Sequence, residues 1–171
     1  LRLLLALDIS LLAYHLPLDA HPEWGNNAQL GQRLGWRADS FFGDQQLGCL
    51  GLAVDGSDWS NAQALAVHLQ NSLGRAPVWV GANHPDRPIR RVAWCTGGAQ
   101  SYYEAAIAAG ADAFVTGEIS EPQAHLARET GVAFFACGHH ATERYGAPAV
   151  AAHVSAQLGL DHLFIDIDNP A

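Results

Sequence analysis

The sequence contains no long apolar run, few basic residues and few cysteines, and each shortage excludes a class of protein. No stretch reaches the about 18 consecutive apolar residues that suggest a transmembrane helix, so we expect no membrane span. The 9 Lys and Arg residues against 17 Asp and Glu residues give a net charge of −8 and a pI near 5.4. Because no basic stripe is present to neutralise phosphates, general nucleic-acid binding is not expected.

Three cysteines occur, at Cys49, Cys95 and Cys137, far apart and without a Cys-x-x-Cys pair. An odd count with no framework spacing is typical of a reducing compartment rather than of a disulfide scaffold. Each cysteine lies in an apolar run, which predicts a small buried side chain. The apolar start of the chain lacks a charged leading region and a small-residue cleavage site, so we expect no signal peptide and a cytoplasmic location.

Methionine is absent, and residue 1 is a leucine. Leu3, Leu4, Ala6 and Leu7 have the pattern of the end of a helix that is already under way. We therefore expect that the natural N-terminus lies upstream of residue 1. This expectation matters for any site that is assembled from distant segments of the chain.

Helix-type and strand-type patterns alternate along the first half of the chain. Strands are expected at residues 11–15, 41–42, 47–54 and 78–80. One predicted helix runs from Asn26 or Asn27 to about Leu34, and a second runs from Ser57 or Asp58 to about Leu73. Each of these helices is followed by a glycine, which is a common helix terminator. Residues 83–88 have the composition of a loop.

After residue 88 the alternation becomes regular. Strands are predicted at residues 89–95, 112–116, 132–137 and 162–167, with helices at 100–109, 120–131 and 139–158. Ser120 is placed to cap its helix, with Pro122 in the first turn. Strands that alternate with helices of about ten residues predict βαβ units. The fold class is therefore α/β, a layered α/β/α arrangement with mostly parallel or mixed sheets.

The same patterns suggest three segments. Residues 1–38 are interpreted as the C-terminal remnant of a first α/β half, and residues 39–85 as a smaller inserted α+β module. Residues 86–171 are interpreted as a second α/β half. The loop near residues 83–88 is the best candidate for a linker.

Two histidines and a glutamate stand where the strand at 132–137 turns into a helix. His139 and Glu143 are four residues apart and His140 and Glu143 three, so either histidine can share a helix face with the carboxylate. Imidazole and carboxylate on one face form half of a divalent-metal site. The ordinary alternative is a helix N-terminus with capping histidines and an acid near its positive end. Spacing alone leaves both histidines and both interpretations open.

Other polar groups follow neighbouring strands, where ligands of α/β proteins gather. Asp19 lies in a stiff loop between two prolines, and it is either a preorganised ligand or a turn residue that bonds local backbone. Glu118 follows the strand at 112–116 and is either a base near the site or a turn acid. The Thr96-Gly97-Gly98 segment matches no phosphate-binding motif, so a tight strand-to-helix turn is favoured.

Five motifs, in order, resemble the Nif-three-like family, whose members are also called GTP cyclohydrolase I type 2 homologues. The resemblance covers nearly the whole chain, and each motif is several residues long. The motifs are His15-Leu16-Pro17-Leu18-Asp19-Ala20-His21-Pro22-Glu23 followed by Gly25-Asn26-Asn27, Val92-Ala93-Trp94-Cys95-Thr96-Gly97-Gly98, Thr116-Gly117-Glu118-Ile119-Ser120, Gly138-His139-His140-Ala141-Thr142-Glu143-Arg144, and Phe164-Ile165-Asp166-Ile167-Asp168-Asn169-Pro170.

This resemblance implies the Nif-three-like α/β fold, a ring-shaped homo-hexamer and a dinuclear metal centre. The implied metal ligands are Asp19, His139 and Glu143, with Glu143 bridging two divalent ions that could be zinc, manganese, iron or cobalt. Family members also carry a tandem His motif upstream of the region where this chain begins, and those ligands are absent here. We therefore expect this chain to bind metal weakly or incompletely.

The function implied by the resemblance is that of a metal-dependent hydrolase acting on a nucleotide or a related small molecule. Two ions would activate a bridging water, and Glu118 or His140 could shuttle protons. The alternatives are a non-catalytic metal-binding or metal-delivery protein and an oligomeric scaffold. Neither a membrane nor general nucleic acid is an expected partner.

Overall fold

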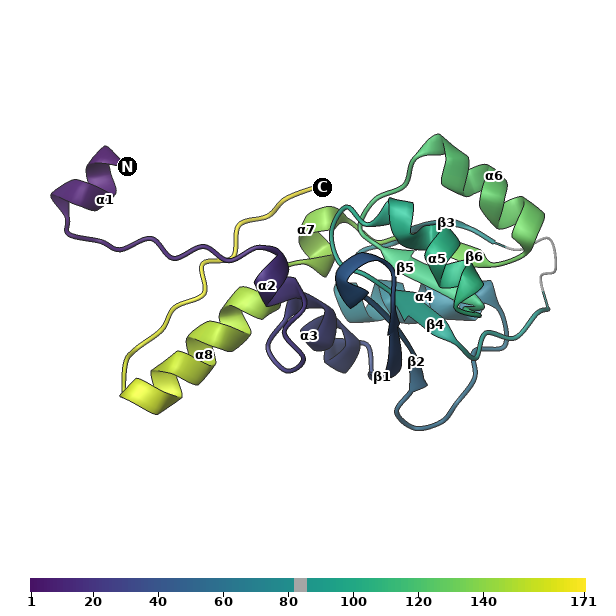
Figure 1. Cartoon of the computed structure of the whole chain (residues 1–171), viewed down its shortest axis with the longest axis horizontal. Helices are drawn as coiled ribbons and strands as arrows, with labels where there is room; N and C mark the ends of the chain where they lie inside the picture. The colour runs from purple at the N-terminus through teal and green to yellow at the C-terminus, as the bar shows by residue number, and fades with distance from the viewer. Residues whose placement is uncertain (82–85) are drawn as a thin grey trace.

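A mixed sheet forms the centre of the molecule in the computed structural model, which describes residues 1–81 and 86–171 (Figure 1). Within these residues the sheet has six strands in the order β1-β2-β4-β5-β6-β3. The strands are β1 (Trp36–Phe42), β2 (Gly48–Ala53), β3 (Val78–Val80), β4 (Val92–Trp94), β5 (Ala113–Thr116) and β6 (Ala133–Ala136). Strands β4, β5 and β6 are parallel, whereas β1, β2 and β3 pair antiparallel with their neighbours. The predicted layered α/β class with a mixed sheet is confirmed.

Helices cover both faces of this sheet because successive side chains of a strand point to opposite faces. On β5, Val115 packs into a core under α3 (Asn26–Arg33) and α4 (Ala62–Leu73). Its neighbour Phe114 packs into a second core under α5 (Tyr103–Ala108) and α6 (Glu121–Thr130). Strands that are buried on both faces carry continuous apolar runs, as the sequence indicates for β5 and β6.

Some of the predicted start and stop signals of the helices are confirmed. Ser120 and Gln123 form a capping box at the start of α6, and Gly131 ends that helix in the left-handed conformation. Gly74 ends α4 in the same way. The predicted caps of the earlier helices are wrong by a few residues, since Asn61 caps α4 and Gly25 precedes α3. Two short 3-10 helices lie in connections: η1 (Asp44–Gln46) joins β1 to β2, and η2 (Gln100–Tyr102) lies between β4 and α5.

The strands predicted at residues 11–15 and 162–167 are wrong. Neither segment has a hydrogen-bonded strand partner among the described residues, and the chain there is irregular and exposed. A single turn of helix, α2 (Leu16–Asp19), follows the first segment. An alternating apolar pattern makes a strand only when a neighbouring strand accepts its backbone hydrogen bonds, and sequence alone does not supply that neighbour.

The helix predicted over residues 139–158 is broken into α7 (His139–Thr142) and α8 (Gly146–Leu158). The amide of Gly146 donates to the Oδ1 atom of Asn26 at 2.7 Å instead of continuing the helical ladder. Pro148 lacks an N–H and cannot bond to the preceding turn, which also favours a new helix start here. The short α7 can therefore be oriented independently of α8.

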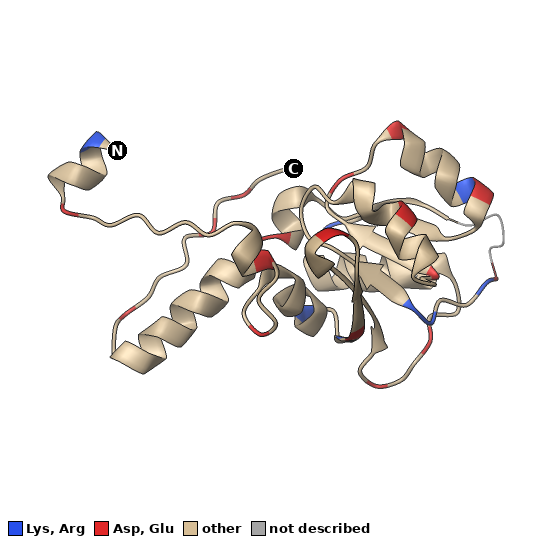
Figure 2. Ribbon diagram, in the orientation of Figure 1, with Lys and Arg blue, Asp and Glu red and all other residues tan. Residues whose placement is uncertain are grey.

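Two arms extend from the sheet on the side of α8 (Figure 1). One contains α1 (Arg2–Ala6) and residues 7–15, and the other is α8 with the tail after it, which runs back to end near α7. Figure 2 shows α8 without a charged residue, and Gly146 is its only buried residue within the part of the chain that the structure describes. None of the described helices combines the length and apolar character needed to cross a bilayer.

The three predicted segments stay a prediction. Strands β1 to β3 come from residues 36–80 and join the same sheet, where β1 pairs with β2, β2 with β4 and β3 with β6. Residues 83–85 of the predicted linker lie outside the described residues.

Candidate metal centre

A sharp turn after β6 carries His139 to the edge of the sheet. Gly138 has φ of +98°, a value that a residue with a side chain rarely adopts. The Thr142 hydroxyl donates to the Gly138 carbonyl at 2.9 Å and accepts from the Gly97 amide at 3.1 Å. Thr142 is fully buried, so it fixes the single turn of α7 against the loop after β4.

Both ring nitrogens of His139 contact carboxylates. Nδ1 lies 2.5 Å from Oε1 of Glu118, and Nε2 lies 2.8 Å from Oε2 of Glu143. The hydrogen bond to Glu118, followed by the charge of Glu143, raises the pKa of His139 above its usual value. The same contact with His139 lowers the pKa of Glu118. Of the two histidines that spacing left open, His139 is therefore the one joined to Glu143.

Asp19 lies at the end of α2 and is held by Asn26. The Nδ2 group of Asn26 donates to Oδ1 of Asp19 at 2.8 Å, while Oδ1 of Asn26 accepts from the amide of Gly146. Asp19 and Asn26 are both buried. One amide side chain thus joins the candidate ligand Asp19 to the start of α8.

The three predicted metal ligands line one cavity of about 280 Å³ at the carboxyl ends of the parallel strands. Asp19 approaches from α2, and His139 and Glu143 approach from α7. Glu118 does not line this cavity, but it contacts His139, which does. His140 does not line it either, and its buried Nε2 atom has no hydrogen-bond partner within the described residues.

Glycines make room for the carboxylates. A Cβ atom on Gly97, which has φ of +68°, would lie 2.8 Å from Oε1 of Glu143. A Cβ atom on Gly98 would lie 3.3 Å from Oε1 of Glu118, and one on Gly117 would lie 2.6 Å from the Gly97 carbonyl. The Thr96-Gly97-Gly98 segment is therefore a tight turn whose lack of side chains admits the two glutamates.

The donor chemistry suits divalent metals, but the arrangement is open. Imidazole and carboxylate donors are those that zinc, manganese and iron take in proteins. Within residues 1–81 and 86–171, no group of three or more His, Cys, Asp or Glu side chains is close enough to hold one ion. His139 and Glu143 form an adjacent pair, and Asp19 is a separate donor on the wall of the same cavity.

Sequence reasoning missed the two asparagines that organise this site. It treated Asn26 and Asn27 as alternative helix caps, whereas both are buried and bond across the fold. Asn27 accepts from the Thr96 amide at 2.8 Å and donates to the Leu47 carbonyl at 3.0 Å. The adjacent pair Asn26-Asn27 in the first of the five family motifs was the sequence feature that could have indicated this role.

The fold and the cavity together define a mixed α/β protein with an imidazole–carboxylate site at the strand ends. The comparison with protein families matches residues 1–170 to Duf34/NIF3 (NGG1p interacting factor 3). This chain belongs to the DUF34/NIF3 family.

Proteins named GTP cyclohydrolase 1 type 2 homolog are among its relatives. The one from Pseudomonas aeruginosa is 49% identical over 177 residues, covering 100% of this chain and 67% of the relative. The one from Neisseria meningitidis serogroup B is 51% identical over 171 residues, covering 98% and 66%. The solved structure of the protein ybgI, described as of unknown function, superposes with a TM-score of 0.91 at 46% identity, covering 99% of this chain and 66% of that one. The chain thus spans about two thirds of the length of these relatives.

Proposed function

We propose that this chain is a metal-binding protein that holds two divalent ions and acts as a hydrolase on a nucleotide or a related small molecule. The observation that carries the proposal is the shared cavity. Asp19 is far in the sequence from His139 and Glu143, yet all three line the same space of about 280 Å³. A purely structural role does not require acidic and imidazole side chains to meet beside a cavity.

Each residue has a distinct part in this proposal. Glu143 and Nε2 of His139 would hold metal, and Asp19 would supply a further donor from α2. Zinc, manganese, iron or cobalt would act as a Lewis acid and lower the pKa of a bound water. Glu118 accepts from Nδ1 of His139 and so fixes which nitrogen faces the metal, as a carboxylate commonly does for a metal-binding histidine.

This geometry favours Glu118 as a positioning residue over Glu118 as the base that takes a proton. The ring of His140 does not line the cavity, so its role as a proton carrier has no supporting contact among the described residues. Activity measurements on the metal-loaded protein test the role of Glu118 and the role of His140. A Glu118→Gln variant that loses activity at unchanged metal occupancy would favour direct proton transfer.

The direct test is isothermal titration with zinc and with manganese. Because three donors serve two ions, we expect weak or incomplete binding. Glu143→Ala should abolish occupancy, and Glu118→Gln should weaken it by about 10–100-fold, the usual loss when the partner of a ligating histidine is removed. Glu129→Gln, an exposed carboxylate on α6, is the matched control. Two tight sites would contradict the expected weak or incomplete binding, and full occupancy in the Glu143→Ala variant would refute the ligand assignment.

A metal-delivery protein without a catalytic step is the second candidate. The open arrangement of His139, Glu143 and Asp19 favours it, because a site without three clustered donors exchanges its ion readily. It predicts transfer of metal to an acceptor such as a chelating peptide, and no turnover on a panel of nucleotides that includes GTP. Turnover that is lost in Glu143→Ala would decide for the hydrolase.

We also propose that copies of the chain associate, with a hexamer as the expected state of the full-length protein. Large apolar side chains stand exposed on both arms, and α8 carries no charge. Surfaces of this kind mark protein–protein contacts. Light scattering coupled to gel filtration measures the assembly, and a strictly monomeric protein over a wide concentration range would contradict it. If the chain assembles only as a non-enzymatic scaffold, the ligand variants will assemble normally and no substrate will be found.

A further inference from the structure

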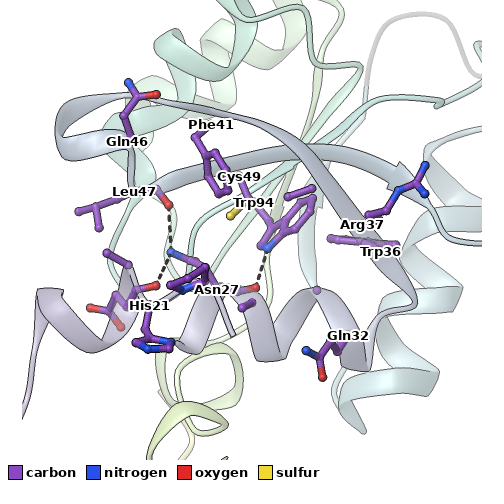
Figure 3. Close-up of a pocket in the computed structure, with 16 residues that line it drawn as sticks. His21, Asn27, Gln32, Trp36, Arg37, Phe41, Gln46, Leu47, Cys49 and Trp94 are labelled. Atoms are coloured by element: carbon purple, nitrogen blue, oxygen red, sulfur yellow. Dashed lines mark hydrogen bonds between the residues drawn. The ribbon is translucent and has the colours of Figure 1, made fainter. Parts of the chain in front are cut away.

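A second cavity lies between α3 and the β1–β2 hairpin, beside the candidate metal centre (Figure 3). Its volume is about 280 Å³, close to the lower limit of about 300 Å³ typical of small-molecule sites. Asp19, Asn27 and Leu47 belong to the walls of both cavities. A ligand in the second cavity would therefore have one end next to the proposed metal ligands.

The inner wall of this second cavity is aromatic and rigid. The indole rings of Trp36 and Trp94 lie 5.4 Å apart between centroids, and both residues are buried. Trp94 is fixed because its Nε1–H donates to the Asn27 carbonyl at 2.9 Å, a bond drawn in Figure 3. Gly31 on α3 admits this ring, since a Cβ atom there would lie 3.0 Å from it. Aromatic walls favour flat ligands that can stack on them.

The opening carries an exposed aromatic ring and unused polar groups. Phe41 is 53% exposed, and Figure 3 shows its ring over the cavity near Cys49. Gln32, Arg37 and Gln46 surround the opening, and none of these side chains makes a hydrogen bond or ion pair within the described residues. They are able to turn onto the polar edge of a bound ring.

His21 also lines this cavity and supplies a preset hydrogen-bond donor. Its Nδ1 atom accepts from the amides of Trp24 at 3.1 Å and Glu23 at 3.2 Å. In the neutral ring the proton must then be on Nε2, which makes no hydrogen bond within the described residues. The ring is held in place by stacking on Trp24 with 4.8 Å between centroids. A ring nitrogen or carbonyl of a heterocycle is the natural acceptor for such a donor.

We propose that this second cavity binds a purine base, with Phe41 and the indole wall contacting its faces and His21, Gln32 and Gln46 serving its polar edge. The proposal deepens the proposed function by naming the purine end of the substrate, and it rests on that function only for what happens to the ligand after binding. Binding itself needs no metal.

The test uses protein freed of metal by a chelator and titrated with guanosine and adenosine. Nitrogen-15 NMR follows the indole N–H signals, with Trp79 as the internal reference because it lies outside this cavity. We expect the Trp36 and Trp94 signals to move and the Trp79 signal to stay, with dissociation constants of about 0.1–1 mM, as befits a small uncharged ligand. Cytidine should bind more weakly, and ribose should cause no shift.

Two variants and one control complete the test. Phe41→Ala removes an exposed ring without disturbing the core and should weaken guanosine binding about 3–10-fold. Ala28→Leu fills the cavity from α3 and should abolish the shifts, with circular dichroism used to check folding. Val67→Ala, an exposed apolar residue on α4, should leave binding unchanged.

The proposal is overturned if guanosine at about ten times the expected dissociation constant moves neither indole signal, if ribose moves them equally, or if both cavity variants bind normally. Purine binding together with failed metal titrations would refute the proposed function and leave this site standing. Metal-dependent turnover without purine binding would refute the purine site and leave the proposed function standing.

Discussion

Removing the side chain of Asn26 should destabilise the protein markedly, because this residue joins Asp19 to α8. Asn26→Ala deletes a hydrogen bond to the Asp19 carboxylate and leaves the buried amide of Gly146 without its acceptor. A hydrogen bond to a charged group contributes about 1.5–3 kcal/mol, and an unsatisfied buried amide costs about 1–3 kcal/mol. Allowing for relaxation, we expect a loss of about 2–4 kcal/mol.

The assay is urea unfolding followed by circular dichroism, with thermal melting as a second measurement. The expected loss corresponds to a fall in Tm of roughly 5–15 °C for a domain of this size. Asn71→Ala, an exposed asparagine on α4, is the matched control and should change stability by less than about 0.5 kcal/mol. A loss below about 0.5 kcal/mol in Asn26→Ala would show that water replaces the amide, and the reasoning would fail.

Three further outcomes are expected. Gly97→Ala should unfold at a lower urea concentration, because the new Cβ meets a positive φ and the Glu143 carboxylate; an unchanged midpoint would contradict this. Arg91→Gln should lower stability at pH 7 by about 0.5–1 kcal/mol, a value limited by the partial exposure of its pair with Asp39. The Arg91 hydrogen bond lowers the pKa of Asp39, so this difference is present above the unfolded pKa and should shrink as pH falls below about 3.8; a constant difference would argue against it. In native protein at pH 8, a thiol reagent should react far more slowly than in urea, because burial raises the pKa of each thiol to about 12. The thiols concerned are Cys49, Cys95 and Cys137.

Much of the fold followed from local pattern. The strand–helix alternation after residue 88 gave β4 to β6 with α5 and α6, and the capping signals at Ser120 and Gly131 marked α6 closely. The predictions failed where a segment needed a distant partner. Residues 162–167 have the composition of a strand but no neighbour to bond, and α8 starts afresh because Asn26, 120 residues earlier, takes its first amide.

The candidate site divides in the same way. Spacing on a helix brought Glu143 to a histidine, but two histidines satisfied that spacing equally. Only the tertiary structure shows that Glu118, from the end of β5, holds Nδ1 of His139 and that His140 lies off the cavity.

By itself, the sequence determined which donors exist, the order of most elements and the family, because periodicity, caps and motifs are properties of neighbouring residues. The tertiary structure alone decided which donors meet, how Asn26 and Asn27 fix them, and that an aromatic cavity lies beside them. The reason is physical. A hydrogen bond or a cavity wall between residues far apart in the chain depends on how the helices pack on the sheet, and periodicity and spacing within one segment do not specify that packing.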